Sequence, residues 1–152
     1  MNRWRAGIAS ALTLIALACS ALAADAPHRK AYIDGPWGQI NVRVVGREGD
    51  PTVVLVHQMT WSSVQYIHAQ DELAARGVRS IAVDIPGYGN SDGPDQPPTA
   101  EQYADALLPV LDAFKLQPAI LLGTNTGSTL ITELADRPSR CRSRALCRRR
   151  IQ

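Results

Sequence analysis

The segment SIAVDIPGYGNSDGP, residues 80–94, joins a short apolar run to a loop rich in glycine, proline and aspartate. The run Ser80–Val83 predicts a buried strand that ends at Asp84. Upstream, Thr52–Val56 is continuously apolar and β-branched, which is typical of a central parallel strand covered on both faces. Downstream, Ala119–Leu122 predicts a third buried strand.

Other elements alternate with these runs. Ala31–Asp34 and Gln39–Val45 predict two strands joined by a turn, and in the second the apolar residues alternate with polar ones. Helices are predicted from about Ser62 to Arg76, from Thr99 to Phe114 and from about Ser128 to Ala135. The second helix starts with a capping box, Thr99 with Gln102. Strands that alternate with helices predict an α/β fold with a mostly parallel sheet and flanking helices.

In open parallel sheets, functional groups gather at the carboxyl ends of the strands. Three loops follow these ends: VHQMTWS (56–62), DIPGYGNSDGP (84–94) and LGTNTG (122–127). Together they resemble the α/β-hydrolase superfamily. Its members carry a His-Gly loop, a D-x-P-G-x-G-x-S-x-x-P loop and the G-x-S-x-G nucleophile elbow after three successive strands. The resemblance covers about residues 31–136, and the second loop matches almost letter for letter.

The resemblance assigns roles by position. The backbone N–H groups of Met59 and Thr126 would form the oxyanion hole, which stabilises charge on a carbonyl oxygen. Gln58 stands where the family usually has glycine. The donors of this loop are backbone N–H groups, so the substitution leaves the donors present but affects the backbone geometry of the loop. The loop-organising positions are His57, Asp84, Gly87, Gly89 and Ser91, and the elbow glycines are Gly123 and Gly127.

Asn125 occupies the nucleophile position of the elbow. Covalent catalysis at this position needs serine, cysteine or aspartate, and an amide is a poor nucleophile. The family holds this residue at positive φ, where asparagine is among the best-tolerated residues. We therefore interpret Asn125 as keeping the turn without the chemistry. The neighbouring hydroxyls of Thr124, Thr126 and Ser128 are alternative candidates, although each also suits a turn or a helix start.

The acid and the base of the catalytic triad follow later in the family's chain order. The three histidines here are His28 in the lead-in, His57 in the first loop and His68 within a predicted helix. None stands where the base is expected, so we predict that these residues alone do not complete hydrolase chemistry. Neither a cofactor nor a metal is expected, because Cys141 and Cys147 have no histidine nearby. In an oxidising compartment these two cysteines could form a disulfide.

Residues 1–23 have the pattern of a secretory signal peptide. Arg3 and Arg5 precede an uncharged Ala/Leu-rich run, and Ala21-Leu22-Ala23 supplies small residues for cleavage after Ala23. The protein is therefore expected to be secreted or periplasmic, without stable membrane association after cleavage. The alternatives are an uncleaved membrane anchor and a lipoprotein modified at Cys19. Residues 24–30 are polar and predict a disordered lead-in.

Charge is distributed unevenly along the chain. The 152 residues carry 16 basic and 14 acidic side chains, yet residues 24–139 hold every acid and only eight of the bases. This acidic body excludes a nucleic-acid-binding role for it. Residues 140–152 hold six arginines and interrupt an amphipathic helix, so we interpret this tail as out-of-frame translation; a basic arm for anionic surfaces is the alternative. Residues 31–139 would then form a partial α/β-hydrolase domain.

Three classes of function follow. The first is an exported hydrolase of small ester or amide substrates that is inactive as this chain. The second is a non-catalytic binder of a small ligand, or a truncated remnant. The third uses the arginine-rich tail to bind a membrane surface or nucleic acid, which a salt-dependent binding assay on a tail deletion would test.

The signal-peptide pattern generates the first testable prediction. When an exporting bacterial host expresses the gene, the mature protein should begin at Ala24, because signal peptidase cleaves after the small residues that end at Ala23. Intact-mass spectrometry of the exported product measures this directly. A mature protein that starts at Met1, or that carries a lipid on Cys19, would contradict the prediction.

Overall fold

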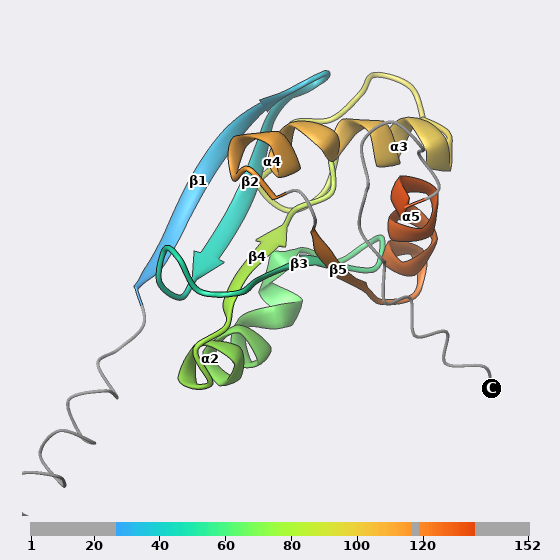
Figure 1. Ribbon diagram of the computed structural model, residues 1–152. Helices are drawn as coiled ribbons and strands as arrows, with labels where there is room; N and C mark the ends of the chain where they lie inside the picture. Colours follow the sequence, from blue (N-terminus) through green and yellow to red (C-terminus); the bar gives the residue numbers. More distant parts are fainter. Residues whose placement is uncertain (1–26, 117–118, 136–152) are drawn as a thin grey trace, which may run out of the picture.

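The computed structural model describes residues 27–116 and 119–135 (Figure 1). The predicted signal peptide at 1–23, Cys19 and the arginine-rich tail at 140–152 with its two cysteines lie outside these described residues. In the two described ranges, no helix has both the length and the apolar character needed to cross a bilayer.

A five-stranded sheet in the order β1-β2-β4-β3-β5 forms the centre of the fold. Its strands are β1 (His28–Gly35), β2 (Gly38–Val45), β3 (Thr52–Val56), β4 (Arg79–Val83) and β5 (Ile120–Gly123). β3 pairs in parallel with β4 and with β5, whereas β2 pairs antiparallel with β1 and with β4. The predicted parallel neighbours and the α/β class are confirmed. The described sheet is more mixed than predicted, because the β1–β2 hairpin contributes antiparallel pairs.

The first strand corrects the predicted lead-in. β1 begins at His28, three residues before the predicted start, so only part of the segment 24–30 precedes it. The register pairs His28 with Val45 and Lys30 with Arg43. The hydrogen bonds between strands join backbone groups, which pair regardless of side-chain polarity. The polar side chains of residues 28–30 therefore gave no apolar pattern that would indicate a strand.

The helix predicted from Thr99 to Phe114 consists of two helices, α3 (Ala100–Ala106) and α4 (Leu108–Ala113). Its predicted capping box is confirmed: the Thr99 hydroxyl accepts the Gln102 N–H, and the Gln102 side-chain oxygen accepts the Thr99 N–H. The break follows from Pro109 near the start of α4. Proline has no N–H to donate, and its ring crowds the carbonyl four residues earlier.

The segment after β3 begins with a 3-10 turn, η1 (Ser63–Tyr66), and continues as α2 (Ile67–Ala75). Burial in this segment does not follow side-chain polarity, because Val64 is 56% exposed while the polar Gln70 is fully buried. The Gln70 amide donates to the Arg43 carbonyl at 3.0 Å and to the Ser80 hydroxyl at 3.2 Å. These bonds attach α2 to the sheet through polar contacts that no periodicity reveals.

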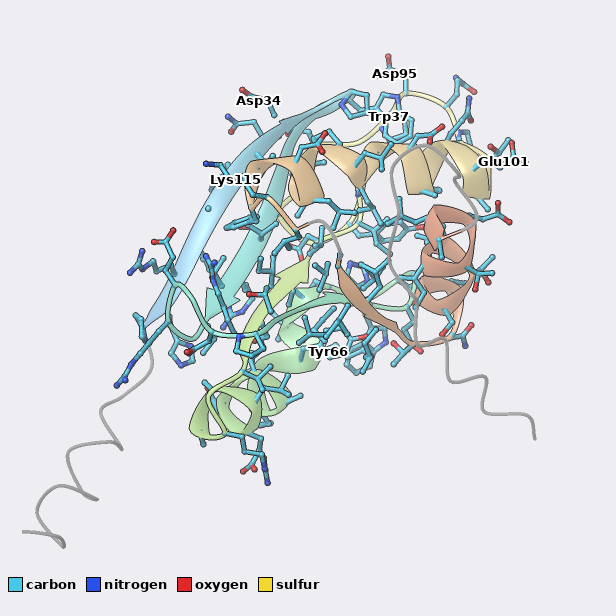
Figure 2. The ribbon with its side chains drawn as sticks, in the orientation of Figure 1. Asp34, Trp37, Tyr66, Asp95, Glu101 and Lys115 are labelled. Carbon is cyan, nitrogen blue, oxygen red and sulfur yellow. The ribbon has the colours of Figure 1, made fainter. Side chains whose placement is uncertain are left out.

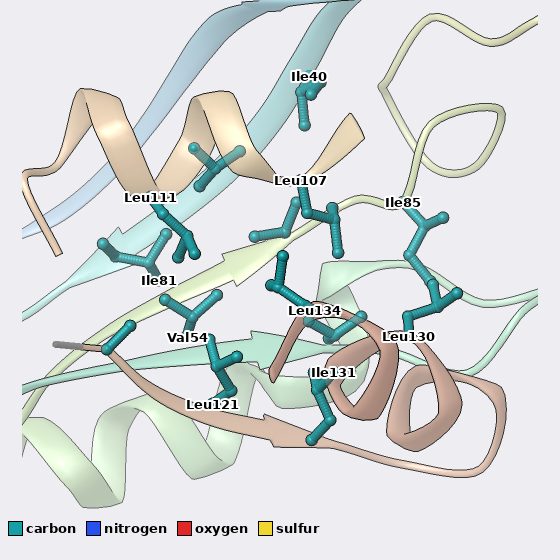
Figure 3. Close-up of a cluster of buried hydrophobic side chains, with 14 of the residues drawn as sticks. Ile40, Val54, Ile81, Ile85, Leu107, Leu111, Leu121, Leu130, Ile131 and Leu134 are labelled. Carbon is teal, nitrogen blue, oxygen red and sulfur yellow. The ribbon is translucent and has the colours of Figure 1, made fainter. Parts of the chain in front are cut away.

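Helices cover both faces of the sheet (Figure 1). On one face, α3, α4 and α5 (Thr126–Ala135) enclose the larger apolar core, much of which Figure 3 shows. On the other face, η1 and α2 cover a smaller cluster of Val53, Leu55, Tyr66 and Ala82, with Leu73 and Val78 packed against it. The sheet thus separates two cores. The carboxyl ends of its parallel strands β3, β4 and β5 lie at one edge.

The strand β5 corrects the prediction that residues 119–122 are buried throughout. Leu121 is buried, but Ile120 is 53% exposed and Leu122 is 47% exposed. The register places these two residues beside Val53 and Leu55, on the face that α2 covers. The cover does not extend to them because α2 packs mainly against β4, and β5 is an edge strand of the described sheet.

This difference in burial predicts a difference in stability. Ile81→Ala should lower the free energy of unfolding by about 2–5 kcal/mol, because Ile81 is fully buried in β4 and its removal leaves a cavity. Ile120→Ala is the matched control and should change stability by no more than about 0.5 kcal/mol, because its side chain is half exposed. Urea unfolding followed by circular dichroism measures both. Equal losses would contradict the arrangement of the strands.

Candidate active site

The three predicted loops meet at the carboxyl ends of β3, β4 and β5. The Ser63 N–H, in the segment after β3, donates to the Asp84 carboxylate at the end of β4. The Met59 N–H, in the same segment, donates to the hydroxyl of Thr126 after β5. The parallel pairing of these strands puts their ends side by side, so residues far apart in sequence become hydrogen-bonding neighbours.

His57 is buried at the end of β3, and both of its ring nitrogens have partners. Nε2 accepts the Ile85 N–H at 2.9 Å, so Nδ1 carries the proton that is donated to the Gln58 carbonyl at 2.7 Å. Burial lowers the pKa of His57, although the bond to Gln58 and the charge of Asp84 act in the opposite direction. His57 is therefore a neutral link between two loops.

Asp84 is fully buried, and its carboxylate accepts three hydrogen bonds. They come from the Ser63 N–H at 2.5 Å, the Asn41 side chain at 2.8 Å and the Asn90 N–H at 2.9 Å. Burial alone would raise the pKa of Asp84, but the bonds from Asn90, Ser63 and Asn41 outweigh it and hold the pKa below the usual value. The carboxylate thus joins β2, β4, η1 and the 84–94 loop.

Glycine is required where this loop passes the carboxylate. Gly89 has φ +59, and a Cβ at this position would lie 2.3 Å from a carboxylate oxygen of Asp84. Farther along, the Ser91 hydroxyl donates to the Asp84 carbonyl at 2.7 Å and accepts the Asn41 N–H at 2.9 Å. The Gly87 N–H closes the loop by donating to the Asp92 carbonyl. The loop-organising residues predicted from the sequence therefore lie together around one buried charge.

The elbow between β5 and α5 depends on close backbone approach. A Cβ on Gly123 would lie 2.4 Å from the Gly127 carbonyl oxygen, and a Cβ on Gly127 would lie 2.3 Å from the Val56 carbonyl oxygen. Between them, Asn125 has φ +50, which confirms the conformation expected at this position. Its side chain is exposed at the apex of the turn. The turn is kept although its apical residue is an amide.

The hydroxyl groups of Thr124 and Ser128 make structural hydrogen bonds. Thr124 Oγ1 accepts the Gln65 side-chain amide at 2.7 Å and lies 3.1 Å from the Tyr66 hydroxyl. Ser128 Oγ donates to the Gly123 carbonyl at 2.8 Å. Tyr66, which lies on the α2 side of the sheet (Figure 2), donates to the Val56 carbonyl at 2.9 Å, and burial raises its pKa. The hydrogen bonds of Thr124, Ser128 and Tyr66 thus stabilise the turn between β5 and α5.

Thr126 is the first residue of α5. Its hydroxyl oxygen lies 2.6 Å from the Met59 nitrogen and accepts that N–H. The two positions assigned to the oxyanion hole are therefore adjacent. In this structure the Met59 N–H therefore donates to a side chain of the protein itself, the Thr126 hydroxyl.

No described histidine is placed to act as a base for residue 125. His28 lies 3.1 Å from Asp71, where it links β1 to α2. His57 has both nitrogens engaged, and His68 is exposed on α2. Across residues 27–116 and 119–135, no group of three or more metal-ligating side chains is close enough to hold a metal ion.

Several supporting residues escaped the sequence analysis. Asn41 alternates with apolar neighbours in β2 and was expected on the exposed face, yet it is fully buried beside Asp84. Gln65 and Tyr66 carry no motif, although both hold Thr124. Only a partner distant in sequence reveals these roles, so no local pattern could have identified them.

A surface hollow of about 400 Å³ lies between the β1–β2 turn and helices α3 and α4. Its walls include Trp37, Leu108 and Pro109, and Trp37 also makes an edge-to-face contact with Tyr103. None of its lining residues belongs to the three loops, so it is separate from the candidate site.

The sequence profile of a known family matches the part of the chain that contains these loops. The α/β hydrolase fold profile matches residues 51–148. The chain belongs to the α/β-hydrolase fold family. Among curated proteins, this α/β-hydrolase family member is 30% identical over 92 residues to an epoxide hydrolase of Caballeronia sordidicola. The aligned region covers 59% of this chain and 28% of that protein.

Two further comparisons involve proteins of Bacillus subtilis. The chain is 30% identical over 117 residues to an uncharacterized carboxylesterase of strain 168, which covers 76% of the chain and 39% of that protein. The crystal structure of a naproxen esterase from this species superimposes with a TM-score of 0.65 at 26% identity, over 72% of this chain and 39% of that one. This α/β hydrolase thus spans about three to four tenths of the length of these relatives.

The buried carboxylate predicts a pH-dependent contribution to stability. Because the pKa of Asp84 is lower in the folded protein, the ionised carboxylate stabilises the fold at neutral pH, and this contribution is lost as the pH falls through the folded-state pKa. Asp84→Asn should therefore cost about 1–3 kcal/mol at pH 7, because N–H donors lose a charged acceptor, and the difference from wild type should shrink in acid.

Asp95→Asn is the matched control, since Asp95 directly follows the 84–94 loop, is exposed and points outward (Figure 2). It should leave the unfolding midpoint nearly unchanged between pH 3 and pH 7 relative to wild type. Chemical unfolding at several pH values measures both variants. An Asp84→Asn penalty that stayed constant from pH 7 into acid would show that ionisation of Asp84 does not stabilise the fold.

Proposed function

We propose that this α/β-hydrolase chain derives from hydrolases of small esters or amides, and that its 152 residues bind such a compound without turning it over. The observation that carries the proposal is the elbow itself. Asn125 stands at the apex of the turn with φ +50. The next residue, Thr126, accepts the Met59 N–H through its hydroxyl. The turn and the backbone donors are suited to a carbonyl oxygen, whereas the apical side chain is not a nucleophile.

The choice of substrate class rests on the donors. A backbone N–H presented at a loop and a helix start interacts with an oxygen that carries negative charge, as the carbonyl oxygen does during acyl transfer. Relatives named as carboxylesterase, naproxen esterase and epoxide hydrolase support a small organic substrate in the lineage. The amide at position 125, where a nucleophile would stand, favours binding without turnover for this chain.

Export belongs to the same proposal. The signal-peptide pattern at 1–23 supports secretion or a periplasmic location, with cleavage after Ala23 and no lasting membrane association. A small, diffusible ligand then suits the acidic body of the protein better than a nucleic acid does.

The proposal predicts that the 152-residue chain hydrolyses p-nitrophenyl acetate no faster than a buffer control that contains denatured protein. Asn125→Ser alone should not restore turnover, because both ring nitrogens of His57 are engaged and neither can take the serine proton. Release of p-nitrophenol, followed by absorbance, measures this. Wild-type turnover that Asn125→Ala abolishes would refute the proposal, since Asn125 would then take part in the chemistry.

A further inference from the structure

The contact between Met59 and Thr126 joins residues 67 positions apart in the sequence. The Met59 N–H points at the Thr126 hydroxyl oxygen, and their heavy atoms are 2.6 Å apart. In the proposed function, this same N–H would donate to the carbonyl oxygen of a ligand. A hydroxyl oxygen therefore occupies the place at this donor that a ligand oxygen would take.

The backbone around Thr126 has no room to move the hydroxyl away. Gly127 lies so close to the end of β3 that a Cβ there would lie 2.3 Å from the Val56 carbonyl oxygen and 2.6 Å from that of His57. The Gly127 N–H also donates to the Thr124 carbonyl at 2.9 Å. The start of α5 is thus fixed against β3, so on the Thr126 side of the contact the hydroxyl leaves Met59 by rotation about the Thr126 χ1 bond.

That rotation is restricted. Threonine is β-branched, so few χ1 positions are available to it in a helix. A rotation that frees the Met59 N–H also gives up a hydrogen bond before any ligand has replaced it. The open form of the donor is therefore the minor form in the unliganded protein.

We propose that Thr126 acts as an internal plug of the oxyanion hole, and that a carbonyl or oxyanion ligand binds only after displacing its hydroxyl from Met59. This inference rests on the proposed function for the identity of the ligand, but the plug itself rests on the contact alone. The apparent affinity for a ligand equals the intrinsic affinity multiplied by the fraction of open protein. The Thr126 hydroxyl then lowers ligand affinity without itself contacting the ligand, whereas the Thr126 backbone N–H remains one of the two donors.

The first measurement tests the plug without any ligand. Hydrogen exchange of the Met59 amide, followed by NMR on the full chain, should be slow in the wild type and in Thr126→Ser, which keeps the hydroxyl. Thr126→Val has nearly the same shape without the acceptor, and its Met59 amide should exchange about two- to tenfold faster, which matches the modest net strength of one hydrogen bond. Circular dichroism establishes that each variant is folded.

The second measurement uses two aromatic probes, acetophenone for a neutral carbonyl and phenylphosphonate for an anionic oxygen. Thr126→Val should bind both about two- to tenfold more tightly than wild type, and by the same factor, because opening precedes binding of either probe. Thr126→Ser should bind like the wild type. An unequal gain, or tighter binding by Thr126→Ser as well, would overturn the plug in favour of a reshaped pocket.

The outcomes separate the plug from the proposed function. If the exchange of the Met59 amide responds as predicted but neither probe binds any variant, the plug stands and the proposed ligand class is wrong. If Thr126→Val is folded and its Met59 amide exchanges as in wild type, the plug is refuted and Thr126 is only a helix-start residue. Should Thr126→Val not fold, fast exchange of the Met59 amide in the wild type would refute the plug, and protected exchange would support it.

Discussion

The buried carboxylate of Asp84 is the interaction on which the strand-end loops depend. A fully buried charge is stable only when hydrogen-bond donors surround it, and Asp84 takes its donors from three separate segments through Asn41, Ser63 and Asn90. The loop can pass close to the charge because Gly89 has no side chain. One ionised group thereby joins the middle of β2, the end of β4 and the start of η1, and so fixes the frame around the candidate site.

A second constraint is steric and acts at the elbow. Gly123 and Gly127 let β5, α5 and the end of β3 approach within distances that a Cβ would prohibit. The turn between them needs a residue that tolerates positive φ, and Asn125 meets that need. Backbone requirements and covalent chemistry are thus separable here. The turn has the backbone conformation expected of a nucleophile elbow, while the residue at its apex, Asn125, carries an amide side chain.

Local patterns predicted the architecture well and the polar interior poorly. Continuous apolar runs identified β3 and β4, because strands covered on both faces need apolar side chains throughout. The same reasoning overestimated burial in β5, where Ile120 depends on a covering element that α2 does not provide. Asn41 and Gln70 are polar yet fully buried, and the side-chain NH2 group of each donates to an acceptor in another segment of the chain, the Asp84 carboxylate for Asn41 and the Arg43 carbonyl for Gln70.

The sequence by itself determined the α/β class, the order of the strands along the chain, the loop motifs and the amide at position 125. Each of these depends on residue type and on short-range spacing, which a sequence displays directly. Only the tertiary structure decided that both nitrogens of His57 are engaged and that the Thr126 hydroxyl lies on the Met59 N–H. These features depend on the distance and direction between groups up to 67 residues apart, which exist only after parallel strands have brought their ends together.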